Sequence, residues 1–215
     1  MITVKEMPVR FGNKKLGTDT CIFNMTTALL CPSYLNGFCK IRGLCYALHA
    51  ELIFPDPLAF RMEQSRVWKS ETAMSIASSL IRQINRRRTK TKFIRFSEAG
   101  DFNTQDDVNK LSRIAELMPE HRFYGYSNRP DLDFSVMPEN VSVNGHGFMA
   151  DNQINVVAEP TGEHYLCPGN CRKCNACKFS KGSIIEIQEH GTEWTMEAIN
   201  RHMLKLGYPQ LVCAA

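Results

Sequence analysis

The sequence predicts an α/β fold, either a small partial barrel or an open, mainly parallel sheet. Short β-rich runs alternate with segments whose apolar residues recur at helical spacing, and polar residues collect at the C-terminal ends of several runs. The 215 residues, 43% of them hydrophobic and 22% charged, suit one globular domain with a full core. We expect a single domain over 1–215, divided into a cysteine loop at 21–45, an α/β core at 46–160, and a C-terminal cysteine cluster and helix at 161–215.

The N-terminal part of the chain is expected to be an extended arm followed by helices. Glycine turns at Gly12 and Gly17 suggest an arm or hairpin that runs to about Thr20 and leads into the cysteine loop. Pro55 and Pro57 end the next helix, because proline cannot continue a helix interior. The expected helices are 46–54 and one or two across 58–88, where apolar residues stand three and four positions apart.

The C-terminal part is expected to supply the sheet. Its predicted strands are 93–97, 122–127, 140–144, 154–158 and 183–187, and its predicted helices are 104–117 and 193–206. Gly207 is well placed to cap the last helix. Because ligands of parallel α/β folds bind at the carboxyl ends of the strands, the turns that follow these strands are candidate site positions.

The cysteine count points to metal chemistry inside a cell. No stretch approaches the roughly 20 consecutive apolar residues of a membrane span, and the first residues lack the apolar core of a signal peptide, so we expect a cytoplasmic protein without membrane contact. Thiols do not persist as structural disulfides in a reducing compartment, so the nine cysteines are expected to be mainly metal ligands or catalytic groups. Cys213 stands alone near the terminus and is expected to have no function.

The most specific motif is a group of four cysteines within eleven residues: Cys167, Cys171, Cys174 and Cys177. Each thiolate would gain far more as a metal ligand than as a small apolar filler. The CxxCxxC run matches the way ferredoxins hold three irons of a cubane cluster, and Cys167 could supply the fourth ligand. Zinc is the alternative, although a structural zinc site usually joins two CxxC pairs through a longer loop.

A second group, Cys31, Cys39 and Cys45, lies in one loop before a predicted helix. Three cysteines could hold three irons of a 4Fe–4S cluster and leave the fourth iron open to a substrate or cofactor. The wider intervals also allow that one or two of them are merely buried, and Cys21 upstream is the first candidate for that role. His49 could be a ligand or support one, but an ordinary helix histidine is the more frequent case.

Polar, glycine-relieved turns follow three neighbouring predicted strands and could form the rim of a pocket for an unknown small molecule. The candidate ligand-binding residues are Arg95, Ser97, Glu98, Gly100, Asp101, Tyr126, Ser127 and Asn128. The third turn contains Asn144 and His146. Asp101 could instead cap the helix that follows it.

A basic stretch contributes much of the net charge of +4, through Arg82, Arg86, Arg87, Arg88, Lys90 and Lys92. We expect mainly a solvated helix end that compensates the helix dipole. Nucleic-acid contact through the Arg82–Lys92 stretch is the alternative.

The chain resembles the phage gene-product-88 family, whose members have no assigned activity. The resemblance runs through Cys31-Pro32, Cys39 and Cys45-Tyr46-Ala47, an R-x-S-x-x-GDF element at 95–102, an FYxYS element at 123–127 and the terminal cysteine cluster. It covers most of the chain. It implies a bacteriophage protein, located in the cytoplasm of the infected host cell.

A more distant likeness is to radical S-adenosylmethionine (SAM) enzymes, which implies a minimal fold of that type and SAM as a ligand. Cys45-Tyr46 looks like the end of the cysteine loop that holds their 4Fe–4S cluster, and Ala99-Gly100-Asp101 looks like the turn that binds the methionine amino group. The usual CxxxCxxC spacing is absent from the N-terminal loop, and a literal match stands instead at Cys167–Cys174.

Two function classes follow from these observations. The favoured one is an iron–sulfur protein with one or two 4Fe–4S clusters, possessing radical-SAM-like architecture, for which enzyme activity is an open question. The alternative is a non-catalytic module, stapled by zinc or by a cluster, that binds nucleic acid or protein. The polar pocket rim favours the first class, because a stapled adaptor would not need it.

Overall fold

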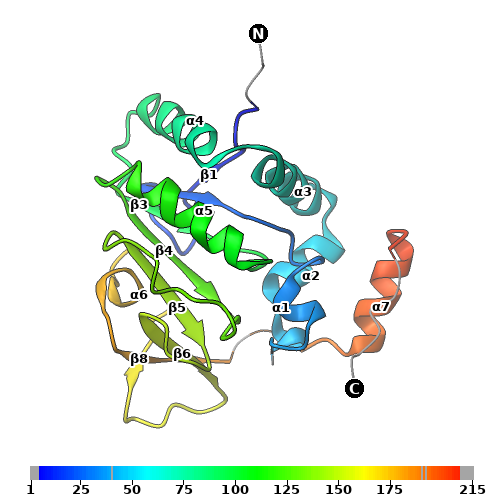
Figure 1. The fold of residues 1–215 in the computed structure, drawn as a ribbon. Helices are drawn as coiled ribbons and strands as arrows, with labels where there is room; N and C mark the ends of the chain where they lie inside the picture. The colour runs from blue at the N-terminus through cyan, green and yellow to red at the C-terminus, as the bar shows by residue number, and fades with distance from the viewer. Residues whose placement is uncertain (1–4, 40, 190, 192, 209–215) are drawn as a thin grey trace.

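The computed structural model of the protein describes residues 5–39, 41–189, 191 and 193–208 (Figure 1). Within them, eight strands form one sheet in the order β1-β2-β3-β4-β5-β6-β8-β7. The strands are β1 (Arg10–Phe11), β2 (Thr20–Phe23), β3 (Phe93–Phe96), β4 (Arg122–Ser127), β5 (Val141–His146), β6 (Asn152–Val157), β7 (Tyr165–Leu166) and β8 (Ile184–Gln188).

The sheet is open and mainly parallel, which confirms that form of the predicted α/β fold over the partial barrel. Only β1 pairs antiparallel, with β2, so the predicted arm forms the first strand of a hairpin whose second strand lies mainly in the predicted cysteine loop; every other described pair is parallel. In the middle of the sheet Arg95 lies beside Ile22 on one neighbouring strand and Tyr124 on the other. β2 was not predicted, because its residues were assigned to the cysteine loop.

The predicted long helices all form, with ends shifted by a few residues. The helices among the described residues are α1 (Pro32–Leu35), α2 (Tyr46–Ile53), α3 (Pro55–Ser70), α4 (Ala73–Asn85), α5 (Gln105–Glu116), α6 (Ala176–Phe179) and α7 (Met196–Lys205), with a 3₁₀ turn at Arg42–Leu44. Pro55 occupies the first position of α3, where its missing N–H costs nothing. Thr72 begins α4 by accepting a hydrogen bond from the Ser75 amide, so the 58–88 region divides into two helices.

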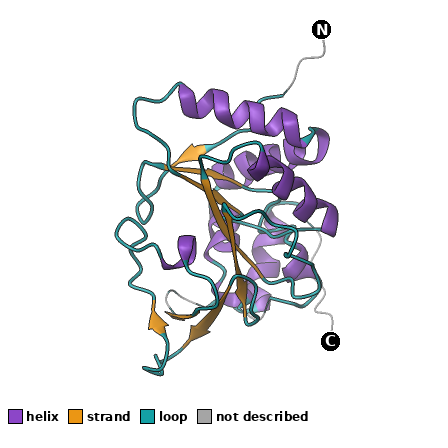
Figure 2. Ribbon diagram, turned by 60° about the vertical axis from the view of Figure 1, so that its left-hand side comes forward, coloured by secondary structure: helices purple, strands orange, loops and turns teal. Residues whose placement is uncertain are grey.

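One face of the sheet packs against α3, α4 and α5, and we call it the helical face (Figure 2). Its strand residues alternate with those of the other face, as the period of two in a strand requires. Ile94, Phe96 and Phe123 on this face are fully buried together with Trp68 of α3 and Leu111 of α5. This core contains most of the large buried side chains of the chain and fixes the position of the central strands.

The opposite side of the sheet carries Phe93, Arg95, Tyr124 and Tyr126, and we call it the tyrosine face. Loops and the short helix α6 cover it in place of long helices (Figure 2). Lys178 of α6 lies 4.1 Å from the centre of the Phe93 ring. The C-terminal cysteine segment therefore covers the tyrosine face.

A second apolar cluster lies beside the sheet, between α1, α2 and α7 (Figure 1). It includes Leu29, Tyr34, Leu48 and Ile199, all buried. Ala99, just after β3, belongs to the same cluster. The N-terminal cysteine loop is thereby packed next to the turn at the carboxyl end of β3.

Candidate metal centre and ligand site

The loop that leads to the N-terminal cysteines is held by a buried glutamate. Glu51 of α2 is 1% exposed, and its carboxylate accepts hydrogen bonds of 2.8 Å from the amides of Ala28 and Leu29. Arg61 of α3 donates to the same carboxylate at 3.0 Å. Burial raises the pKa of Glu51, and the amides and Arg61 oppose that rise. This role was not predicted, because a glutamate on a short helix usually faces solvent.

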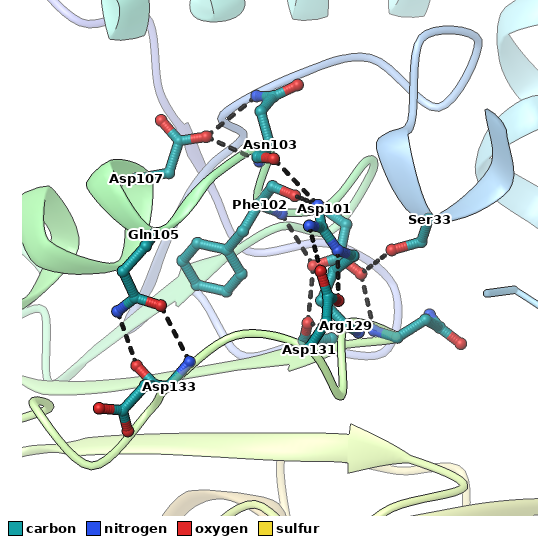
Figure 3. Close-up of polar contacts among 11 residues, drawn as sticks. Ser33, Asp101, Phe102, Asn103, Gln105, Asp107, Arg129, Asp131 and Asp133 are labelled. Atoms are coloured by element: carbon teal, nitrogen blue, oxygen red, sulfur yellow. Dashed lines mark hydrogen bonds and ion pairs between the residues drawn. The ribbon is translucent and has the colours of Figure 1, made fainter. Parts of the chain in front are cut away.

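Asp101 joins the same region to the ends of two strands (Figure 3). It is 1% exposed, and Oδ2 accepts hydrogen bonds of 2.7 Å from Ser33 Oγ and from the Asn128 amide. Oδ1 accepts bonds of 2.8 Å from Ser127 Oγ and from the Phe102 amide. A carboxylate offers about four acceptor positions. A ligand that bound Asp101 directly would have to displace one of these groups.

Gly100, predicted as part of a ligand-binding turn, makes a close contact with the cysteine loop. Its φ of +72° is in the left-handed region, and a Cβ placed there would lie 2.4 Å from Thr26 Cγ2 and 2.8 Å from the Thr26 carbonyl oxygen. Only glycine allows this approach. Ser97, also predicted, has a φ of +50°, and its buried Oγ has no hydrogen-bond partner.

The structure brings Cys31, Cys39 and Cys45 into one neighbourhood. Cys31 precedes α1, Cys45 precedes α2, and the Cys39 amide donates a 2.9 Å bond to the Ser33 carbonyl. Burial is the main cause that raises the pKa of Cys31, and the negative charges of Asp101, Cys39 and Cys45 add to it. Burial likewise raises the pKa of Cys39 to about 11. These thiols are partly buried, and Cys39 and Cys45 both act electrostatically on Cys31.

The C-terminal cysteines gather separately, on the tyrosine face. One cavity of about 20 Å³ is lined by Tyr124, Tyr126, Cys167, Asn170, Cys171, Cys174, Cys177 and Lys178. Lys178 is 4% exposed and donates from Nζ to the Cys171 carbonyl at 2.9 Å. Burial raises the pKa of Cys177 to about 11. The two predicted cysteine groups thus lie at different places, one beside α1 and α2 and the other beside α6 (Figure 1).

The chemistry of both groups suits a soft metal. All eight cysteines within the described part of the chain are free thiols. Within that part, no group of three or more His, Cys, Asp or Glu side chains is placed so that it could hold a metal ion. Thiolates are the preferred ligands of iron–sulfur clusters and of structural zinc, so the cysteines suit an iron–sulfur cluster or a zinc ion.

Cys21 and His49, the other candidate ligands within the described residues, both pack against apolar or aromatic side chains. Cys21 lies in β2 with its side chain in the core, and burial raises the pKa of its thiol to about 12. His49 stacks on Trp194 with 4.4 Å between the ring centres, in the contact between α2 and the segment that precedes α7. Cys213 lies outside the described residues. These placements agree with the expectation that Cys21 is a buried bystander.

The remaining predicted ligand residues divide between the two regions. Arg95 and Tyr126 meet on the tyrosine face, where the guanidinium lies 4.8 Å from the ring centre. Glu98 accepts a 2.7 Å bond from Asn13 Nδ2. The Asn128 side chain bonds to the ring of His146 at the end of β5. The strand-end residues therefore contact one another and the cysteine loop, and Arg95 lies apart from them.

The basic stretch ends α4 and is tied to the N-terminal arm. Arg86 forms an exposed ion pair of 3.3 Å with Glu6, and Arg87 donates to the Thr18 carbonyl at 3.0 Å. The Arg87 guanidinium also lies 3.9 Å from the centre of the Phe11 ring. The remaining arginines and lysines of the stretch are exposed.

Comparison with known proteins finds one family. The model of the family described as Gene product 88 matches residues 7–147, about two thirds of the chain. No curated protein and no solved structure matches. The matched region contains the N-terminal cysteines and the strand-end turns, and it ends before Cys167. None of the described helices is both long and apolar enough to span a membrane.

Proposed function

We propose that this chain, which belongs to the Gene product 88 family, is an iron–sulfur protein with a ligand-accessible cluster. Cys31, Cys39 and Cys45 would hold three irons of a 4Fe–4S cluster and leave the fourth iron open. The main support for this proposal is that the three cysteines lie close together beside the turn after β3. Ligands of parallel α/β folds bind at the carboxyl ends of strands, which is where this turn lies.

The scaffold around these cysteines supports a preorganised site. Two buried carboxylates hold the loop: Glu51 through the amides before Cys31, and Asp101 through Ser33 just after it. Metal ligands are positioned well when supporting hydrogen bonds fix the segments that carry them. A loop that merely connected β2 to α2 would not need two such anchors.

The C-terminal group is proposed to bind a second metal. Its ferredoxin-type spacing favours a 4Fe–4S cluster. A single zinc ion with a structural role is the alternative at these four cysteines. One group packs against the apolar cluster of α1, α2 and α7 and the other lines the cavity on the tyrosine face, which supports two sites over one shared ligand set.

A bound cluster with an open iron would supply a Lewis-acid and redox centre to a small molecule, and the expected ligand is SAM. The phage origin of the family and a cytoplasmic location in the infected cell belong to the same proposal. A nucleic-acid or protein partner, bound by a zinc-stapled module, is the competing function.

The test is metal and sulfide analysis of protein purified without oxygen. Iron and acid-labile sulfide in near-equal amounts are expected, and zinc with no sulfide would reject the proposal. Cys39→Ser and Cys174→Ser should each lower the metal content of one group, since metal binding is coupled to local folding. Cys213→Ser, the matched control, should lower neither.

A second measurement addresses the open iron. The reduced protein is mixed with SAM, and the cluster spectrum and the formation of 5′-deoxyadenosine are followed. A changed spectrum or a cleavage product supports the open site. An unchanged spectrum with no product would favour a cluster closed by four protein ligands.

A further inference from the structure

Arg95 occupies an unusual position for a charged residue. It lies in β3, in the middle of the sheet, and its side chain is on the tyrosine face between β2 and β4. The guanidinium lies 4.8 Å from the ring centre of Tyr126 and 5.8 Å from that of Tyr124. Such contacts bind the flat faces of a guanidinium and leave the N–H groups at its edge free to donate.

The described residues provide Arg95 with no ion pair. Glu98 is the acid that acts on it electrostatically, but Glu98 accepts from Asn13 at 2.7 Å and lies 4.0 Å from Arg61. Arg95 Nε is inaccessible and has no hydrogen-bond partner. An N–H group held away from water without an acceptor is costly.

A second unsatisfied polar atom lies beside it. The hydroxyl of Tyr124, the residue paired with Arg95 across the strands, is buried, and Arg95 is the group that it faces; no hydrogen bond of good geometry joins the two. Buried polar groups are nearly always well paired, so two buried atoms that face each other without a good bond leave room for a ligand that would bind both. Forked N–H donors together with a hydroxyl match the oxygens of a carboxylate or a phosphate.

A ligand bound by Arg95 would lie between the two cysteine groups. On one side Tyr126 forms a side-chain hydrogen bond with Cys177. On the other side Tyr46, which follows Cys45, donates a 2.9 Å bond to the Glu98 carbonyl, and the residue is 58% exposed. Arg95 acts electrostatically on Tyr46 and Tyr126 alike. A molecule held by Arg95 would therefore lie within the space that both groups approach.

We infer that Arg95, backed by Tyr124 and Tyr126, is a binding residue for the oxyanion group, carboxylate or phosphate, of a small molecule on the tyrosine face. This deepens the proposed function, because it names the charge class of the ligand and assigns it to a face distinct from the Asp101 turn. The oxyanion contact itself requires no particular metal.

The test measures binding of inorganic phosphate and, separately, of acetate by calorimetry at constant ionic strength, with the metal content of every sample recorded. Saturable binding of one of these to the wild-type protein is expected, and the stronger one identifies the group. Arg95→Gln should weaken it by about tenfold or more, the loss expected when a charged hydrogen-bond donor is removed. Arg88→Gln, which removes the same charge at an exposed position, should change it by less than about twofold.

The outcomes separate this inference from the proposed function. Arg95→Lys keeps the positive charge but loses the paired N–H donors of the guanidinium. We therefore expect an intermediate affinity for the anion, with an unchanged circular dichroism spectrum. Absence of binding by the wild-type protein, or equal binding by Arg95→Gln, overturns the inference. Loss of metal in Arg95→Gln with unchanged anion binding also overturns it and makes Arg95 the counter-charge of the Cys171 site. Arg95-dependent binding to a protein without iron would reject the iron–sulfur proposal alone.

Discussion

Ser33 Oγ donates a 2.7 Å hydrogen bond to Asp101 Oδ2, although 68 residues separate the two in the chain. This bond fastens the first turn of α1, next to Cys31, to the end of β3. The same oxygen accepts from the amide that follows β4. One carboxylate thus sets the distance between the cysteine loop and two strand ends.

Replacing Asp101 should therefore affect the N-terminal cysteines first. Asp101→Asn leaves a buried donor facing other donors, and we expect a loss of about 1–3 kcal/mol in the free energy of unfolding. Metal bound by Cys39 and its neighbours should fall while metal at the C-terminal group is retained. Urea unfolding and metal analysis measure the two effects, and Asp106→Asn at an exposed position is the control.

If Asp101→Asn lowered ligand binding with unchanged stability and metal content, its carboxylate would be a ligand contact and not an anchor. Ser33→Ala sharpens the comparison, because it removes one of the four donors and no charge. It should cost about 1 kcal/mol.

Gly100 and Gly147 form a matched pair for testing the close approach to the cysteine loop. Both have positive φ, +72° and +74°, but a Cβ at Gly147 would meet nothing within 4 Å. Gly147→Ala should cost only the backbone strain, about 1–2 kcal/mol. Gly100→Ala should cost clearly more, because its Cβ would collide with the Thr26 backbone. Equal losses in urea unfolding would contradict the assigned role of Gly100.

Glu51 is expected to be among the most sensitive positions to charge removal. Glu51→Gln removes the 3.0 Å ion pair of Arg61, which is nearly buried, and leaves it only Glu98 at 4.0 Å; breaking a buried pair typically costs about 3–5 kcal/mol, and Glu98 should offset part of that loss. Glu63→Gln is the control, since Glu63 pairs with Arg66 at an exposed position of the same region and should contribute less than about 1 kcal/mol. Thermal unfolding of the two variants measures the difference.

The basic stretch is expected to stabilise the N-terminal arm more than to bind nucleic acid. Changing Arg86, Arg87 and Arg88 together to Gln should loosen the arm, because Arg87 contacts Thr18 and Phe11. Amide hydrogen exchange over residues 5–20 should rise in this variant. Tight, salt-sensitive binding of generic DNA or RNA by the wild-type protein, lost in the variant, would instead assign the stretch to nucleic acid.

The sequence predicted the periodic parts of the fold well and the buried polar contacts poorly. Helical spacing located α4 and α5, since each buries one apolar stripe against the sheet. β2 was missed because all four of its residues are buried, so no alternation distinguishes it, and Cys21 drew the segment into the cysteine loop. The cysteine grouping followed from spacing alone.

The roles of Asp101 and Glu51 could not follow from spacing. The partners of Asp101 come from α1, β4 and the following turn, and those of Glu51 from the loop before α1 and from α3. Such contacts depend on the arrangement of distant segments. Arg95 was predicted as one of several strand-end residues, and the strand register shows that it shares a face with Tyr124 and Tyr126 and lies apart from Asp101, Ser127 and Asn128.

The segment from Cys167 to Ser180 buries a single residue, Lys178. The hydrophobic effect, which fixes the helical face, has little to act on here. In the proposed protein, metal coordination by the four cysteines would accordingly hold this segment on the tyrosine face. The metal supply of the cell would then decide whether this segment is held on the tyrosine face. In a cell poor in that metal, the protein would have a folded core and an uncovered tyrosine face.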